Sequence, residues 1–497
     1  MKKYILISTS IIIYFITINT LISQTNKEDE LFRTKIDTYL NTCASNGFSG
    51  TVLVSKKGKI ILSKGYGWAD SKNKIPNTTS TVFNIGSVTK QFTASAILKL
   101  VEQKKIKTSD KINLFFDQTP LDKKEITIHQ LLTHTSGISS KTGGYRYNEA
   151  SKEQFLNDFF KSKLQSKPGT KYQYANANYI MLTAILENVS KQTYNSYLKE
   201  FLFKPSQMNS TGYKSINFNT EKLAHGYYYS LKDEKWVDWG TTQQHLPNNN
   251  NHWYSIGKGD IHSTVEDLYK WHVSLKNNIV LSSETRSIQE TAYVAENDKK
   301  TSHYGYGWAI SKSERESKIV AHNGSNGLYF ADFIRFTDED ITIIYLTNKF
   351  LGSESENIGR KIGKMYFNPK HKASPISKNI YELINQFIKI NPITNASKLP
   401  AFLKKEIKNN FNNPSILNQI AYSKLKKEDK PNWALELFKL NVKLFPKDGN
   451  LWDSLGEAYS KYNQREEAKK SYTKALKLGN KESAKALNKL LEKNKLE

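Results

Sequence analysis

A single cysteine, Cys43, occurs among the 497 residues, so the chain can form neither an intrachain disulfide nor a cysteine-based metal site. Its 25 glycines and 12 prolines are too few for a collagen-like chain, and a hydrophobic content of 38% excludes a wholly disordered one. One long apolar run lies at the N-terminus and no second run follows, which excludes a multi-span membrane protein. A globular chain of about two to four domains remains.

Arginine is also scarce, although the formal net charge is +26. Of the 73 basic residues only seven are arginine, the residue that proteins usually use for bidentate contacts with phosphate and guanine. The lysine excess therefore favours a solvated surface, and we predict no nucleic-acid partner.

The N-terminus has the order of a secretory signal. Lys2 and Lys3 precede the apolar run 4–22, and Ser23 opens a polar stretch. We therefore predict a signal peptide over residues 1–23 and an exported protein, either periplasmic or secreted. The run is nearly long enough to span a bilayer, so an uncleaved anchor is the alternative and the only membrane association predicted.

Strand patterns lie early and late in residues 30–367. Two β-rich runs around a Lys-Lys-Gly turn predict a hairpin within 47–66, and the spacing of apolar residues predicts a helix over 91–101. Strand signals return at 306–310, 318–322, 329–336 and 341–346. This order predicts one α+β domain whose sheet joins both ends of the segment.

The C-terminal part changes to lysine-rich, helix-forming sequence. We predict a helical linker over 368–410 and helical repeats over 411–497, with a capping helix from Lys481. Trp452, Leu455, Gly456, Tyr459, Ala468, Tyr472 and Ala475 fit the pattern of one tetratricopeptide repeat, and Ala434, Phe438 and Pro446 suggest a degenerate one. An ordinary helical hairpin is the alternative. Because two repeats are fewer than the usual minimum, we expect them to dock on the preceding domain or on a protein partner.

A serine and a lysine stand one helical turn apart at the start of the helix expected near residue 91. A serine hydroxyl is a weak nucleophile until a neighbour takes its proton, and a buried lysine next to Ser87, such as Lys90, can orient the hydroxyl or accept that proton. The spacing Ser-x-x-Lys also occurs at Ser71/Lys74 and elsewhere, so this pair alone carries little weight.

Two further motifs give the pair a context. With Ser87-Val88-Thr89-Lys90, the segments Tyr174-Ala175-Asn176 and His322-Asn323-Gly324 resemble the three motifs of the class C β-lactamase and DD-peptidase-like serine hydrolases. The similarity extends to segments 48–54, 130–138 and 257–271 and spans about residues 30–365. It implies an antiparallel sheet flanked by helices, with a helical subdomain, followed here by the helical repeats.

The resemblance also implies a role for each site residue. Ser87 is the expected nucleophile of an acyl-enzyme, Lys90 its activator and Tyr174 the proton shuttle. Asn176 is expected to hold Lys90 and the substrate amide. His322 and Gly324 are expected on a strand that lines the site, and the backbone amides of Ser87 and Ser325 are expected to form the oxyanion hole. The mechanism needs no metal and no organic cofactor.

The sequence departs from the family pattern in one place that affects the substrate. His322 stands where many β-lactamases have lysine, and histidine is nearly neutral at physiological pH. The expected substrates are therefore D-amino-acid peptides, esters or, less favoured, β-lactams. His134 is expected to be structural, and Lys141-Thr142-Gly143 mimics the third motif in the wrong place. The alternative is a catalytically retired module that binds peptides and uses the repeats for recruitment.

Overall fold

The computed structural model describes residues 27–213, 222–245, 252–407, 411–427 and 431–493. The predicted signal peptide lies outside these residues. The described residues form two compact units. The first unit extends to Ile376 but excludes residues 228–237, and the second unit consists of Tyr228–Val237 and the described residues from Ser377 onward. The first unit thus extends past residue 367, the boundary expected from sequence. No helix in the described ranges is both long and apolar enough to cross a bilayer.

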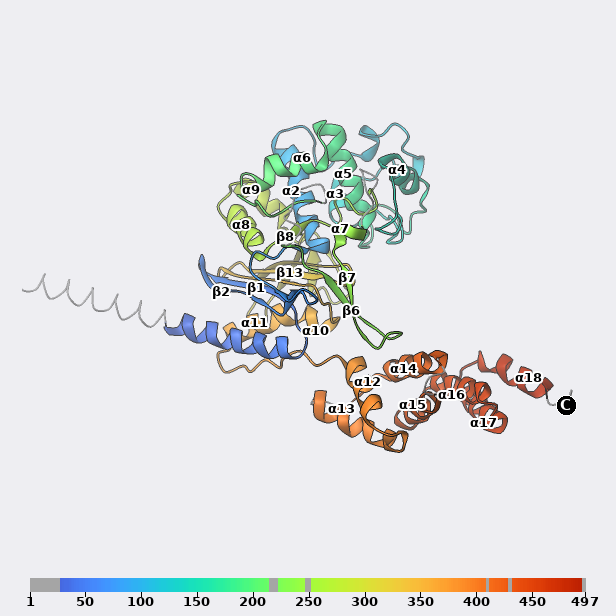
Figure 1. Cartoon of the computed structure of the whole chain (residues 1–497). Coiled ribbons are helices and arrows are strands. Elements are labelled where there is room, and N and C mark those ends of the chain that lie inside the picture. The colour runs from blue at the N-terminus through green and yellow to red at the C-terminus, as the bar shows by residue number, and fades with distance from the viewer. Residues whose placement is uncertain (1–26, 214–221, 246–251, 408–410, 428–430, 494–497) are drawn as a thin grey trace, which may run out of the picture. The chain divides into compact units, whose positions relative to one another are not determined.

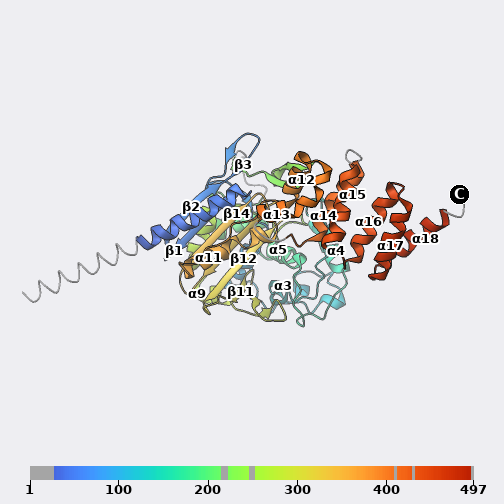
Figure 2. The same ribbon diagram turned by 90° about the horizontal axis from the view of Figure 1, so that it is seen from below.

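Within its described residues, the first unit contains an eight-stranded antiparallel sheet in the order β2-β1-β14-β13-β12-β11-β10-β9. Figure 2 shows β2, β1, β14, β12 and β11 side by side. The strands are β1 Gly50–Lys56, β2 Lys59–Tyr66, β9 Val294–Ala295, β10 Ser302–Tyr304, β11 Ala309–Lys312, β12 Lys318–Ser325, β13 Phe330–Phe336 and β14 Ile341–Thr347. Because β1 pairs with β14, with Val52 opposite Tyr345, the prediction that the sheet joins both ends is confirmed.

One predicted strand begins later than expected. Residues 306–308 belong to the turn between β10 and β11, and the strand starts only at Ala309. Gly307 makes the turn, with φ of +74°, and a Cβ there would lie 2.8 Å from the carbonyl oxygen of Lys90. Apolar periodicity does not register such a turn, because Tyr306 and Trp308 are themselves buried.

Alternating side chains of the sheet enter two separate cores. Leu53 and Ile344 face a core shared with helices that include α2 Thr89–Glu102 and α8 Val265–Lys276. Val52 and Ile343 face the other core, which a helix over residues 27–45 and α11 Ile358–Phe367 cover. Figure 1 shows these two helix layers on opposite sides of the sheet. This arrangement confirms the predicted α+β class.

The helical part of the first unit surrounds α2, which is buried over most of its length. Its other helices are α3 Ile128–Leu132, α4 Lys152–Lys161, α5 Asn176–Ser190, α6 Tyr194–Leu198, α7 Thr242–His245 and α9 Ser283–Gln289. The short helix α10 Ser353–Glu356 lies beside α11 on the other side of the sheet (Figure 1). Short strand pairs add β3 Trp68–Asp70 with β4 Ile75–Pro76, and β5 Phe83–Asn84 with β8 His262–Ser263.

The second unit is helical. It contains α12 Ile380–Ile390, α13 Leu399–Ile407, α14 Pro414–Lys427, α15 Pro431–Leu444, α16 Gly449–Lys461, α17 Arg465–Lys477 and α18 Ser483–Lys493. It also contains the tip of the hairpin formed by β6 Gly226–Ser230 and β7 Lys235–Gly240, where the Trp236 indole donates to Glu382 (3.0 Å). Helices are thus present where repeats were expected, while their assignment as tetratricopeptide repeats stays a prediction.

Candidate active site

Ser87 lies in a short 3-10 turn, Gly86–Val88, that leads directly into α2. The Asn84 side chain fixes the entry to this turn, because its oxygen accepts from the Gly86 amide (3.0 Å) and its nitrogen donates to Asp260 (2.8 Å). Gly86 has φ of +50° and lies close to the chain at Ser325, where a Cβ would come within 2.7 Å of the backbone nitrogen. The turn therefore presents Ser87 at the first turn of a buried helix.

Lys90 stands one turn further along and is completely buried. Its Nζ donates to Ser87 Oγ (3.0 Å), to Asn176 Oδ1 (2.9 Å) and to the carbonyl oxygen of Lys258 (2.8 Å). Burial is the main cause that holds the pKa of Lys90 well below its usual value, and the positive charges of Lys258 and Arg146 lower it further. Asp260 acts in the opposite direction. A lysine in this setting can release its proton and then accept one from Ser87.

Tyr174 lies in the extended segment before α5, and Lys90 Nζ lies 4.8 Å from the centre of its ring. Burial raises the pKa of Tyr174 above its ordinary value, and a hydrogen bond with Ser87 partly opposes the rise. The phenol is therefore protonated at neutral pH. This electrostatic setting makes Tyr174 a proton donor at the start of a reaction and makes Lys90 the better acceptor.

His134 supports this segment. Its Nδ1 accepts the Ala175 amide (3.2 Å), and its ring lies 4.2 Å from the ring of Tyr174. Burial, followed by the charges of Lys90 and His322, lowers the pKa of His134 well below its usual value, so the ring is neutral. The contacts are those of a residue that positions the extended segment before α5. Lys141-Thr142-Gly143 lies in a turn and not on a strand.

β12 brings the third motif to the same place. Gly324 packs against the Ser87 turn, because a Cβ there would lie 2.2 Å from the Ile85 oxygen and 2.4 Å from the Ser87 nitrogen. The backbone amides of Ser87 and Ser325 are thereby held close to each other, as an oxyanion hole requires.

His322 carries no charge at this position. Its Nδ1 lies 2.6 Å from the Asn323 oxygen and its Nε2 lies 2.9 Å from the Tyr304 hydroxyl. Because Nδ1 must donate to the carbonyl, Nε2 accepts from Tyr304. Burial, and then the charge of Lys90, lowers the pKa of His322 to about 3. The structure thus brings Ser87, Lys90, Tyr174, Asn176, His322, Gly324 and Ser325 into one region of the first unit.

Comparison with known proteins decides the family. The family model described as β-lactamase matches residues 32–362, about two thirds of the chain. The chain belongs to the β-lactamase family. Among curated proteins, "Penicillin-binding protein 4*" of Bacillus subtilis (strain 168) is 29% identical over 324 residues, which are 62% of this chain and 70% of that protein. The "Putative penicillin-binding protein PbpX" of the same strain is 28% identical, over 71% of this chain and 78% of that protein.

Solved structures share the fold of the first unit. The octameric penicillin-binding protein homologue from Pyrococcus abyssi is 26% identical, with a TM-score of 0.58 over 68% of this chain and 78% of its own. D-amino acid amidase from Ochrobactrum anthropi SV3, complexed with D-phenylalanine, has a TM-score of 0.59 over 68% of this chain and 99% of its own. At 19% identity, the amidase shows the shared fold alone.

Sequence reasoning missed three charged residues of this β-lactamase-family site. Asp260 is completely buried and accepts from Asn84 and from Arg146 Nη1 (3.4 Å). Lys258 is nearly buried, and burial followed by the Arg146 charge lowers its pKa to about 8. Lys258 and Asp260 alternate with glycines in the framework segment 257–271, which is a signal that could have been noticed. Nothing in the sequence around Arg146 marks it.

A group with possible metal ligands occurs elsewhere in the first unit, at Asp70, His225 and Asp238. Asp238 lies 2.9 Å from His225 Nδ1 and Asp70 lies 3.7 Å from Nε2. Because the carboxylates approach opposite ring nitrogens and a histidine binds one ion through one nitrogen, the contacts fit a histidine that is hydrogen-bonded to Asp238 and lies near a second carboxylate better than a metal centre.

Proposed function

We propose that this protein is an exported serine hydrolase that forms an acyl-enzyme on Ser87 and cleaves an amide or ester. The observation that carries the proposal is the hydrogen bond from Lys90 Nζ to Ser87 Oγ, made by a lysine that is completely buried. Burial supplies a lysine of lowered pKa, and an adjacent base is what a serine nucleophile needs. Membership of the β-lactamase family of serine hydrolases supports the same chemistry.

In the first step, Ser87 Oγ bonds to the substrate carbonyl carbon while its proton passes to the Lys90 amine. The carbonyl electron pair moves onto oxygen, where the amides of Ser87 and Ser325 stabilise the charge. The carbonyl then re-forms and the bond to the leaving group breaks. The leaving group takes a proton from Tyr174, which regains one from Lys90. Water repeats the sequence on the acyl-enzyme and releases the carboxylic acid.

The substrate class follows from the neutral His322. A β-lactam or a peptide with a free carboxylate gains no positive charge from this imidazole, whose pKa is about 3. Esters and D-amino-acid amides or peptides that lack a free carboxylate are therefore favoured over β-lactams. The similarity to the structures of D-amino acid amidase and of the hydrolase EstCE1 supports this range of substrates.

Intact-mass spectrometry tests the mechanism. The purified protein is incubated with an activated ester and, separately, with a penicillin. We expect a covalent adduct that Ser87→Ala abolishes and that the matched variant Ser71→Ala retains, because Ser71 heads another Ser-x-x-Lys sequence, in an exposed turn. The relative rates then rank the two substrate classes.

The alternative is a retired, peptide-binding protein that recruits a partner through the predicted repeats. The helical second unit is the observation in its favour. Folded wild-type protein that forms no adduct with either reagent would support it. Export is proposed from the signal pattern in residues 1–23, and the mass of the protein recovered from its native host would show whether that segment is removed.

A further inference from the structure

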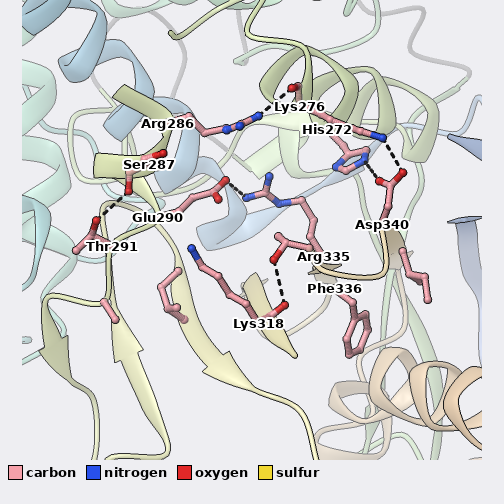
Figure 3. A pocket seen from close by; sticks show the side chains of 14 residues that line it. His272, Lys276, Arg286, Ser287, Glu290, Thr291, Lys318, Arg335, Phe336 and Asp340 are labelled. Carbon is pink, nitrogen blue, oxygen red and sulfur yellow. Dashed lines mark hydrogen bonds and ion pairs between the residues drawn. The ribbon is translucent and has the colours of Figure 1, made fainter. Parts of the chain in front are cut away.

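A pocket of about 500 Å³ lies in the first unit between α8, the end of α9 and the sheet. Lys318 lies at the start of β12, Arg335 near the end of β13, and His272 on α8. Among the described residues, those lining the pocket include none of the catalytic side chains. Figure 3 shows His272, Arg335 and Lys318 around the same space.

The pocket has more positive than negative side chains. Four cationic residues, Lys276, Arg286, Lys318 and Arg335, line it together with two acids. Arg335 pairs with Glu290, and Lys276 pairs with Asp340 at 2.6 Å. Arg286 donates to the carbonyl oxygens of residues 275 and 276, which are uncharged partners.

Lys318 supplies a cation that the protein leaves available. Within the described part of the chain its amine makes no hydrogen bond or ion pair, and Figure 3 shows the amine directed toward Glu290 and Arg335. With Arg286, it accounts for the two positive charges that carboxylates do not balance.

Two buried nitrogens in this pocket have no partner in the described structure. Arg335 is only 4% exposed, and its Nε has no hydrogen-bond partner. Its guanidinium lies 4.6 Å from the centre of the Trp308 ring, which fixes the plane of the group. His272 is 7% exposed, and its Nδ1 also has no partner. Buried polar groups are normally paired. Both nitrogens are covered by protein atoms here, so a ligand can accept from them only when the side chains at the pocket wall shift.

His272 can act as such a donor while neutral. Burial, followed by the charge of Arg335, lowers its pKa to about 3. The Thr342 hydroxyl lies 3.2 Å from Nε2, and Asp340 Oδ1 lies 4.0 Å from the same nitrogen. In the tautomer in which the hydroxyl donates to Nε2, the ring proton is on Nδ1. The pocket then offers a guanidinium, an imidazole N–H and a lysine amine.

We propose that this pocket binds an organic phosphate monoester. Two unbalanced positive charges match the charge of a phosphate monoester near pH 7, which is about −1.5 to −2. Arginine suits phosphate oxygens because its N–H groups form a planar fork. The volume is in the usual range for small-molecule sites, and Ala292, Ile310 and Ile341 offer apolar surface to an organic group.

Calorimetric titration of the full chain with phenyl phosphate, at constant ionic strength, tests the proposal. We expect saturable binding at one site, weakened about tenfold in Lys318→Ala, because a hydrogen bond to a charged group is lost. Lys163→Ala is the matched control, since Lys163 is an exposed lysine outside this pocket and should leave the affinity unchanged. No binding, or equal binding by Lys318→Ala, would overturn the proposal.

Two further measurements keep the assignment specific. Inorganic phosphate should bind more weakly than phenyl phosphate, and equal affinity would overturn the monoester assignment. The double variant Arg335→Gln/Glu290→Gln removes the buried ion pair without leaving either charge alone, and circular dichroism establishes that it is folded. Folded double variant that still binds phenyl phosphate with wild-type affinity would contradict the role of Arg335.

Discussion

Replacing Gly324 with alanine should slow acylation of Ser87 about a hundredfold while the first unit stays folded. The new methyl group would lie 2.2 Å from the Ile85 oxygen and 2.4 Å from the Ser87 nitrogen, whereas ordinary contacts begin at 3.4 Å. β12 and the Ser87 turn must therefore separate by about 1 Å, and a displacement of that size can cost about 10² in rate. Loss of one oxyanion donor has a similar cost, about 10²–10³.

The assay is a time course of adduct formation with an activated ester, together with thermal denaturation of the same samples. Gly259→Ala is the matched control, because its Cβ would lie 3.8 Å from Gly86, which is an ordinary contact. We expect this control to acylate within a few-fold of wild type. Wild-type acylation by folded Gly324→Ala, or an equal loss in Gly259→Ala, would refute the argument that the close approach of β12 positions Ser87.

Three other substitutions test separate parts of the molecule. Lys258→Met removes a cation that lowers the pKa of Lys90, so that pKa should rise. The acidic limb of the plot of acylation rate against pH should therefore move to higher pH, and an unchanged profile would contradict this. Burial raises the pKa of Asp332 from 3.8 to about 7, so its contribution to stability is complete below pH 3.8 and is lost as pH rises through 7. Asp332→Asn should remove that dependence, which is measured as the difference between the free energies of unfolding in urea at pH 5 and pH 8. An equal decrease in the free energy of unfolding in the wild type and the variant would contradict the argument. Gly456→Ala would place a Cβ 2.7 Å from the Tyr472 ring and should destabilise the second unit by about 1–3 kcal/mol, whereas an unchanged thermal transition would show that the ring moves aside freely.

The sequence was most informative where local patterns carry the structure. Apolar strands separated by turn residues predicted the β1–β2 hairpin and the later strands β12 to β14, and the pairing of β1 with β14 followed from their common domain. The motif residues were found for a different reason. Ser87 and Lys90 are one helical turn apart, so their contact is local, and the family pattern identified the rest.

Contacts between residues far apart in the sequence could not be predicted from the sequence. Arg146 approaches Asp260 across 114 positions of sequence, and no periodicity connects the two. The tip of the β6–β7 hairpin belongs to the second unit through contacts such as that of Trp236 with Glu382, although both strands lie within the predicted hydrolase segment. Individual charges and single hairpins leave no repeating pattern, so their partners become visible only in the folded chain.

The histidine of the third motif, His322, does not supply positive charge to the site. In the sequence, His322 raised the question of how a site without the usual lysine charge would work. The structure shows that Tyr304 and a backbone carbonyl occupy both ring nitrogens and that burial keeps the ring neutral. The positive charges that act on Lys90 come instead from Lys258 and Arg146, and they lower its pKa. A lysine at position 322 would offer its charge to the substrate. Here the charges of Lys258 and Arg146 instead favour the neutral form of Lys90, which is the form that can take the proton of Ser87.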